Sequence, residues 1–303
     1  MRLLLTGSNG LIGGYLLRNF SNRFEKIYCL GRKKADKFEF INHDLRFSLK
    51  KNLPEVDVVL HLAAQTSVYD SEKFILENHK INTFGTINLL EKLKLQKNPP
   101  FFIFFGSATQ VGYTNKKTPI TCENKDNPIT FYDLSKLCAE RYLIHYINSN
   151  WIRGCSLRLC NVFGAHSLKQ NIERGVIDRV FLKALAGKKI SIYDGGLYIR
   201  DYIYIDDVIS AIFDSLKNQE KINGKTFFLG SGNGTSIKKA FYTAINVAKI
   251  LTKKEPLVKI VKSPINISLI EKRSFIADMK EFTNCTNWKP KYNLKTGLIK
   301  SYV

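Results

Sequence analysis

The chain has 303 residues, 44% of them hydrophobic and 24% charged, a composition typical of globular proteins. Its formal net charge is +21, but the basic residues are dispersed, which favours a solvated lysine surface over a nucleic-acid partner. No apolar run reaches 18 residues, and the apolar stretch at the N-terminus is too short for a signal peptide. We therefore expect no membrane insertion and a cytoplasmic protein.

In the first half of the chain, short apolar runs alternate with longer amphipathic stretches. The apolar runs predict strands over residues 2–6, 26–30, 38–41, 56–63, 101–106 and 154–160. The stretches between them predict helices over residues 11–20, 70–96 and 131–149. This alternation predicts an α/β fold with a doubly wound parallel sheet of the Rossmann type, forming a dinucleotide-binding domain over residues 1–163.

The pattern changes after about residue 163. Here the sequence predicts helices near 173–187, 206–217 and 235–251, with short strands around 190–193, 203–205 and 226–230. Glycine and proline breakers separate these pieces. We expect a smaller mixed α/β domain over residues 164–303 that binds the substrate, with segments at about 203–235 returning to the first domain.

Three glycines follow the first predicted strand and open the first predicted helix. Glycine there permits a tight turn, close approach of a pyrophosphate to the backbone, and close packing of the helix on the sheet. The helix N-terminus then offers free N–H groups and a positive dipole end to the phosphates. The residues expected to contact a dinucleotide here are Thr6, Gly7, Asn9, Gly10, Leu11, Ile12 and Gly13.

The end of the second strand bears on the choice of dinucleotide. An acid there accepts hydrogen bonds from the ribose hydroxyls of NAD, whereas an arginine accommodates the 2′-phosphate of NADP. The chain has Gly31 and Arg32 at this point, followed by two lysines. This favours NADP(H), with Arg32 as a contact. A basic surface turn is the structural alternative, so NAD(H) stays open.

The cysteines and histidines lack the spacings of metal sites. Among six cysteines there is no C-x-x-C pair, and the five histidines are scattered. We expect buried reduced thiols, no disulfides and no metal. His61 follows an apolar strand, which indicates a packed structural residue.

Tyr132 and Lys136 are four positions apart in a predicted helix, so they share one face. In a lysine-rich chain this spacing also arises by chance. The chain also contains the glycine loop and then, in this order, "HLAAQTSV", "LRLCNVFG", "IRDYIYIDDV" and "NWKPKYNLKTGL". With these motifs together, the chain resembles the extended short-chain dehydrogenase/reductase family. The resemblance covers nearly the whole chain and is closest to the branch of nucleotide-sugar epimerases, dehydratases and reductases.

The resemblance implies a catalytic set of Ser107, Tyr132 and Lys136. Gapless placement of "SAT" selects Ser107, with Thr109 as the alternative because the usual V-Y-G is "QVG" here. Hydride transfer to or from a sugar carbon requires a matching proton transfer at its oxygen. A tyrosine has an ordinary pKa of about 10, and a nearby ammonium favours its phenolate. Lys136 would supply that charge and also bind the cofactor ribose, while Ser107 would orient the sugar oxygen.

Further positions follow from the resemblance alone. Asp44 and Leu45 match residues that flank the adenine, and Leu62, Ala63, Ala64 and Gln65 match the strand end beside the cofactor. The residues implied for substrate binding are Thr66, Ser67, Thr109, Asn161 and Arg200. A structural role for Arg200, paired with Asp206 or Asp207, competes with diphosphate binding. Another arginine that often binds the diphosphate has no clear match, Arg273 being nearest.

The residues after Ser107 bear on the reaction. Dehydratases of this branch carry an Asp–Glu pair there, whereas this chain has Ala108 and Thr109, which argues against a 4,6-dehydratase. The basic turn favours reduction of a 4-keto sugar nucleotide by NADPH, with Tyr132 as proton donor. An NAD-dependent 4-epimerase is the alternative, and a catalytically silent dinucleotide-binding regulator is a remote one. Many relatives are dimers, so a homodimer is also an expectation.

Overall fold

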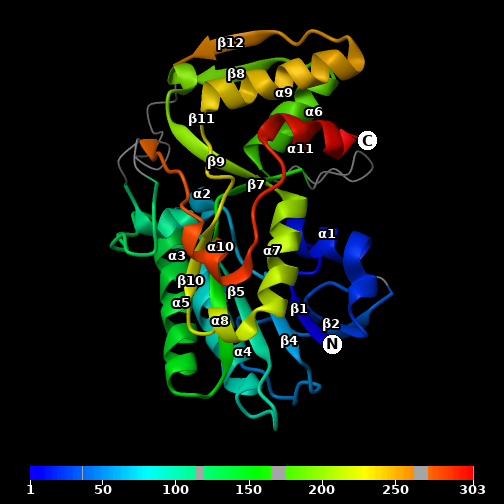
Figure 1. The fold of residues 1–303 in the computed structure, drawn as a ribbon, viewed down its shortest axis with the longest axis vertical. Coiled ribbons are helices and arrows are strands. Elements are labelled where there is room, and N and C mark those ends of the chain that lie inside the picture. Colours follow the sequence, from blue (N-terminus) through cyan, green and yellow to red (C-terminus); the bar gives the residue numbers. More distant parts are fainter. Residues whose placement is uncertain (36, 114–118, 165–174, 263–271, 303) are drawn as a thin grey trace. The chain divides into compact units, whose positions relative to one another are not determined.

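The computed structural model describes residues 1–35, 37–113, 119–164, 175–262 and 272–302 (Figure 1). Within it the chain forms two compact units. The first unit comprises Met1–Gly112, Lys125–Arg158 and Phe213–Phe227. The second unit comprises Tyr113–Asn124, Leu159–Ile212 and Phe228–Val303.

A seven-stranded sheet with the order β10-β6-β5-β4-β1-β2-β3 forms the centre of the first unit. Its strands are β1 (Arg2–Thr6), β2 (Lys26–Gly31), β3 (Glu39–Asn42), β4 (Val58–His61), β5 (Phe101–Ser107), β6 (Arg153–Leu159) and β10 (Thr226–Leu229). The pairs β1–β2, β1–β4, β2–β3 and β4–β5 are parallel. The strand order reverses at β1, so the predicted doubly wound sheet is confirmed.

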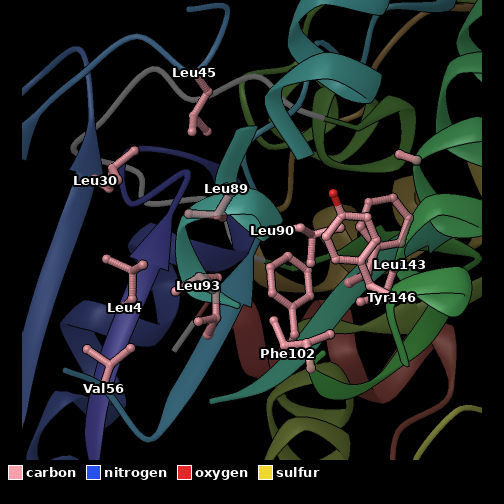
Figure 2. Packing of buried hydrophobic residues seen from close by; sticks show 14 of the residues in the cluster. Leu4, Leu30, Leu45, Val56, Leu89, Leu90, Leu93, Phe102, Leu143 and Tyr146 are labelled. Atoms are coloured by element: carbon pink, nitrogen blue, oxygen red, sulfur yellow. The ribbon is translucent and has the colours of Figure 1, made fainter. Parts of the chain in front are cut away.

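Helices pack on both sides of this sheet (Figure 1). The core on one side joins α4 (Gly85–Leu93) and α5 (Phe131–Asn148) to the strands, and Figure 2 shows Leu90, Phe102 and Leu143 meeting there. On the other side lies α1 (Leu11–Phe20), where Phe20 contacts Phe213 in the part of α7 (Ile205–Lys217) that belongs to the first unit. Both β4 and β5 are buried along their whole length, as continuous apolar runs require in a sheet covered on both faces. Short helical segments η1 (Ser21–Arg23), η3 (Ala108–Val111) and α8 (Gln219–Ile222) complete the connections.

The single helix predicted over residues 70–96 is wrong. The structure has α2 (Val68–Lys73), α3 (Ile75–His79), a π-helical turn η2 (Lys80–Phe84) and then α4. The break falls at Phe74, whose backbone leaves the helical region at φ −123° and ψ 59°. Nothing in the local pattern marks this break, because the residues on both sides favour helix.

The second unit contains two small sheets. One has the order β11-β9-β7, from β7 (Asn161–Phe163), β9 (Ile199–Tyr204) and β11 (Gly234–Ser236). The other pairs β8 (Ile190–Tyr193) with β12 (Val258–Val261) in parallel. The remaining elements are α6 (Val176–Leu185), η4 (Asp194–Gly196), α9 (Ile237–Thr252), α10 (Lys280–Thr286) and α11 (Leu294–Tyr302).

Most predictions for the second half correspond to these elements. The strand predicted at 190–193 is β8, and the one predicted at 203–205 is the end of the longer β9. The start of the helix predicted at 173–187 lies outside the described residues. Across the described ranges, no helix is long and apolar enough to cross a membrane. All six cysteines are free, three of them buried.

A buried ion cluster lies between β6 and α5. The Arg158 guanidinium donates through Nη1 to Asp126 at 2.6 Å and through Nε to Glu140 at 3.1 Å. Ser156 also donates to Glu140. Arg158 is 4% exposed and Glu140 1% exposed. Neither carboxylate is left without a cation, which is the condition under which buried charges are tolerated.

Removing the cation should therefore destabilise the first unit. We expect Arg158→Met to lower the free energy of unfolding by about 3–5 kcal/mol, because Glu140 stays buried as an uncompensated charge. Urea unfolding at neutral pH measures this. The matched control is Arg153→Met on the same strand, where an exposed pair with Glu220 is worth at most about 1 kcal/mol. Equal losses in the two variants would contradict the prediction.

Candidate active site

The glycine loop packs directly against the end of β4. A Cβ on Gly7 would lie 2.7 Å from the backbone nitrogen of Ala63, and Gly7 also has a φ of +74°. A Cβ on Gly13 would lie 2.4 Å from the Gly7 carbonyl oxygen. Helix α1 begins after Gly10, which has no side chain to cap it, so the cap residue takes up none of the first N–H groups of the helix. This geometry fits a bound diphosphate.

The turn after β2 is attached to the glycine loop. Asn9 donates its side-chain amide to the carbonyl oxygen of Lys33 at 2.9 Å. Gly31 ends β2, and a Cβ built on it meets no atom within 4 Å. Arg32 is exposed in the same turn. The end of β2 thus combines open space with basic side chains.

Asp44 is held by a neighbouring arginine. The Arg46 guanidinium donates to its carboxylate at 2.6 Å and also pairs with Glu77 at 2.9 Å. Arg46 lowers the pKa of Asp44, and the charge of Arg32 contributes to the same shift. Leu45 is buried in the core of the first unit, so its side chain serves packing.

His61 links β4 to β1 and α4 through two hydroxyls. The Thr86 hydroxyl donates to the carbonyl oxygen of Asn82 at 2.7 Å, so it accepts from His61 Nε2 at 3.0 Å. Nδ1 then accepts from the Thr6 hydroxyl at 2.8 Å, while Thr6 Oγ1 accepts the Ala63 N–H. Burial, and secondarily the charge of Lys136, lowers the pKa of His61 to about 3. The imidazole is neutral and structural, as its place after an apolar strand predicted.

The loop after β4 is fixed by amides. Asn82 accepts from the Gln65 N–H at 2.9 Å and donates to the Gln65 carbonyl at 3.1 Å. The same Asn82 amide donates to Ser135 Oγ on α5 at 2.9 Å. Thr66 is exposed, and Ser67 caps α2 by accepting the Asp70 N–H. Leu62 and Ala64 complete this loop and are half-buried.

Ser107 ends β5 and starts the short helix η3. Its backbone N–H donates to the side-chain oxygen of Gln110 at 2.7 Å. Its hydroxyl lies 2.7 Å from Thr109 Oγ1, and the Thr109 hydroxyl donates in turn to the Asp133 carboxylate on α5. The predicted hydroxyl residue and its alternative are therefore hydrogen-bonded to each other and joined to the helix that carries Tyr132.

Tyr132 and Lys136 lie in the first two turns of α5. The Tyr132 N–H donates to Ser71 Oγ at 3.1 Å, which ties this helix end to α2. Lys136 is 3% exposed, and its Nζ lies 4.1 Å from the ring centre of Phe104 on β5. Burial lowers the pKa of Lys136 to about 7. The three predicted catalytic residues thus lie on adjoining elements of one unit.

The second unit contains the two implied diphosphate residues. Asn161 donates to the carbonyl oxygen of Asp201 at 3.3 Å. The Arg200 guanidinium donates to the carbonyl oxygens of Ile199 and Arg273. Asp206 and Asp207, the two alternative partners of Arg200, have contacts of their own. Asp206 pairs with Lys300, and Asp207 accepts backbone N–H groups of the C-terminal segment.

Two residues at the site were missed in the sequence. Asp133 stands three positions after Thr130 at a helix start, a pattern that indicates helix capping and not contact with η3. Gln110 is the first residue of "QVG", which stands where the family usually has V-Y-G. In the sequence this difference only made the local alignment uncertain. Only the structure shows that the Gln110 side-chain oxygen accepts the Ser107 N–H. Across the described ranges, no cluster of three potential metal ligands is present.

Comparison with known proteins places this geometry in a family. The family described as "NAD dependent epimerase/dehydratase family" matches residues 3–230. The chain belongs to this family. It is therefore an enzyme of the extended short-chain dehydrogenase/reductase type, as its motifs predicted.

Individual relatives cover the whole chain or most of it. A CDP-paratose 2-epimerase from Salmonella typhi is 27% identical, covering 100% of this chain and 98% of the relative. A UDP-glucose 4-epimerase from Mycolicibacterium smegmatis is 30% identical, covering 81% of this chain and 82% of the relative. A solved UDP-glucose 4-epimerase from Thermotoga maritima, with UDP-glucose, has a TM-score of 0.83 and 25% identity, covering 99% and 97%.

The buried ammonium of this epimerase/dehydratase-family site gives a testable dependence on pH. The folded protein holds the Lys136 proton more weakly than the unfolded chain, whose lysine has the ordinary pKa of 10.5. Between about pH 7 and 10.5 the unfolded state therefore binds more protons, and the Lys136 contribution to the free energy of unfolding rises with pH.

We expect the wild type to gain stability relative to Lys136→Met between pH 7 and pH 9, by at most about 1.4 kcal/mol per pH unit. Urea unfolding of both proteins at three pH values measures this. If the difference in free energy of unfolding between the two proteins stayed constant over this range, the pKa of Lys136 in the folded protein would not be near 7.

Proposed function

We propose that the protein reduces a 4-keto nucleotide-diphosphate sugar with NADPH. The bound cofactor supplies the hydride. Tyr132 donates the proton to the sugar oxygen, and Ser107 hydrogen-bonds that oxygen. The observation that carries the chemistry is the bond from Thr109 to Asp133, because it joins the Ser107 end of β5 to the first turn of the helix with Tyr132 and Lys136.

Lys136 supports this role by its environment. A lysine with a pKa of about 7 exists in both protonation states near neutral pH, so its ammonium form can give a proton to a tyrosine phenolate, whose ordinary pKa is about 10. In its charged form it favours the phenolate that Tyr132 becomes when it donates its proton, and it can return a proton to that phenolate after each turnover. The packing of Nζ against Phe104 keeps this charge next to β5.

The end of β2 supports NADPH. An acid that would accept bonds from the ribose hydroxyls is replaced by Gly31, which leaves room for a 2′-phosphate. Arg32 then supplies a planar donor group suited to phosphate oxygens. Asn9 fixes this turn to the glycine loop, so both phosphate-binding elements are held together.

The sugar nucleotide is inferred from the relatives. The enzymes from Mycolicibacterium smegmatis and Thermotoga maritima carry UDP-glucose in their names, and the one from Salmonella typhi carries CDP-paratose. We assign Asn161 and Arg200 to the diphosphate, since an arginine fork fits paired phosphate oxygens. Thr66, Ser67 and Thr109 are assigned to the sugar.

A 4-epimerase is the second candidate, because two of these relatives are named UDP-glucose 4-epimerases. Such an enzyme needs the same Tyr132 and Lys136, but it returns the hydride to the sugar and shows no net use of cofactor.

The reaction can be tested with purified protein. We expect NADPH to be oxidised only after a 4-keto nucleotide sugar is added, and Tyr132→Phe to lower kcat by roughly 10²–10⁴-fold because the proton donor is lost. The absorbance of NADPH measures both. Near-full turnover in Tyr132→Phe would refute the role of the tyrosine. Interconversion of UDP-hexoses without net NADPH oxidation would instead select the epimerase.

Cofactor choice can be tested at Gly31. We expect Gly31→Asp to weaken NADPH binding by roughly tenfold or more, because the new carboxylate repels the 2′-phosphate, and to strengthen NADH binding. Titration of nicotinamide fluorescence measures both affinities. Lys34→Gln is the matched control, since it makes the same change of charge in the same turn without placing a carboxylate at the ribose. Tighter binding of NADH than NADPH by the wild type would contradict the assignment.

A further inference from the structure

Ser107, Thr109 and Asp133 form a hydrogen-bond chain with a definite direction. A carboxylate accepts hydrogen bonds and donates none when ionised, so the hydrogen of the Thr109 hydroxyl is committed to Asp133. Thr109 Oγ1 can then only accept from Ser107, whose oxygen is 2.7 Å away. The Thr109 N–H also donates to Ser107 Oγ at 3.3 Å. The chain therefore runs from Ser107 through Thr109 to Asp133.

The Asp133 carboxylate is not needed to cap α5. The first N–H groups of α5 already have acceptors from other residues: Glu72 for Phe131, Ser71 for Tyr132, and Thr130 for Asp133. Asp133 is 0% exposed, and burial of a carboxylate is costly unless it is hydrogen-bonded. Its bond from Thr109 crosses from α5 to η3, away from the helix that it would cap.

This direction determines what Ser107 can offer to a substrate. Its hydrogen points to Thr109, and one of its two lone pairs accepts the Thr109 N–H. One lone pair remains, and it suits the sugar hydroxyl that forms when Tyr132 protonates the keto oxygen, because that hydroxyl can donate to it. We propose that Asp133 is a positioning residue that fixes the direction of the Ser107 hydroxyl through Thr109. This inference rests on the proposed function, in which Ser107 contacts the sugar oxygen.

The bonded chain itself can be tested without substrate. We expect Thr109→Val to lower Tm by about 2–4 °C, because Asp133 stays buried without that donor. Combining it with Asp133→Asn should lower Tm by clearly less than the sum of the two single changes. Thr109→Ser keeps the hydroxyl and should restore most of the loss. Additive shifts in a thermal double-mutant cycle would overturn the link between the two residues.

The positioning role is tested by turnover of a 4-keto nucleotide sugar. We expect Thr109→Val and Asp133→Asn each to lower kcat by roughly 10–100-fold with little change in NADPH affinity, and Asp133→Asn to leave KM nearly unchanged as well. In a Ser107→Ala background the same changes should have no further effect, because no hydroxyl is left to orient. Losses of equal size with and without Ser107 would overturn the proposal. A higher KM for Thr109→Val with an unchanged kcat would do so too, since Thr109 would then contact the sugar without orienting Ser107.

Glu72→Gln is the matched control, because it changes a carboxylate at the same end of α5 and keeps an acceptor for the Phe131 N–H. We expect its kcat to stay within twofold of the wild type. The two experiments also separate the two proposals. If the wild type turns over no nucleotide sugar, the proposed function fails, while the thermal cycle still decides whether the bonded chain exists.

Discussion

The docking of α5 on the central sheet is the constraint on which the site depends. Apolar residues of this helix, among them Leu143 and Tyr146, are buried in the core beside Phe102 (Figure 2). Each such side chain contributes about 1.5–3 kcal/mol when it leaves water. That contribution offsets the cost of bringing Lys136 and Asp133 out of water at the other end of the same helix. The packing of the apolar residues of α5 thus fixes the positions of Lys136 and Asp133.

Local signals made much of this structure predictable. The glycine loop was identifiable because Gly7 and Gly13 must be glycine for steric reasons. In the structure, neighbouring backbone atoms lie so close to both residues that a Cβ would not fit. The buried strands were predictable because a sheet covered on both faces needs continuous apolar runs. Tyr132 and Lys136 were found through helical spacing combined with motifs elsewhere in the chain.

The features that escaped prediction depend on residues distant in sequence. Asp133 binds Thr109 across 24 positions, and its own neighbourhood is explained by capping alone. The helix break at Phe74 also leaves no local mark, because the residues on both sides of it favour helix. His61 was correctly expected to be a packed residue, but its bonds to Thr6 and Thr86 need three separate elements in register.

The π-helical turn at Lys80–Phe84 has a consequence for how the chain can vary. Asn82 and Thr83, adjacent in sequence, both reach Ser135, one at its hydroxyl and the other at its carbonyl oxygen. Neighbours in an α-helix project about 100° apart, and the wider turn reduces that divergence. A π-helical turn holds one residue more than an α-helical turn, so loss of a single residue here would give a regular α-helix and keep the leucines of α4 in the core. Relatives that lack one residue at this turn should therefore keep the packing of α4 but lose one of the two contacts to Ser135.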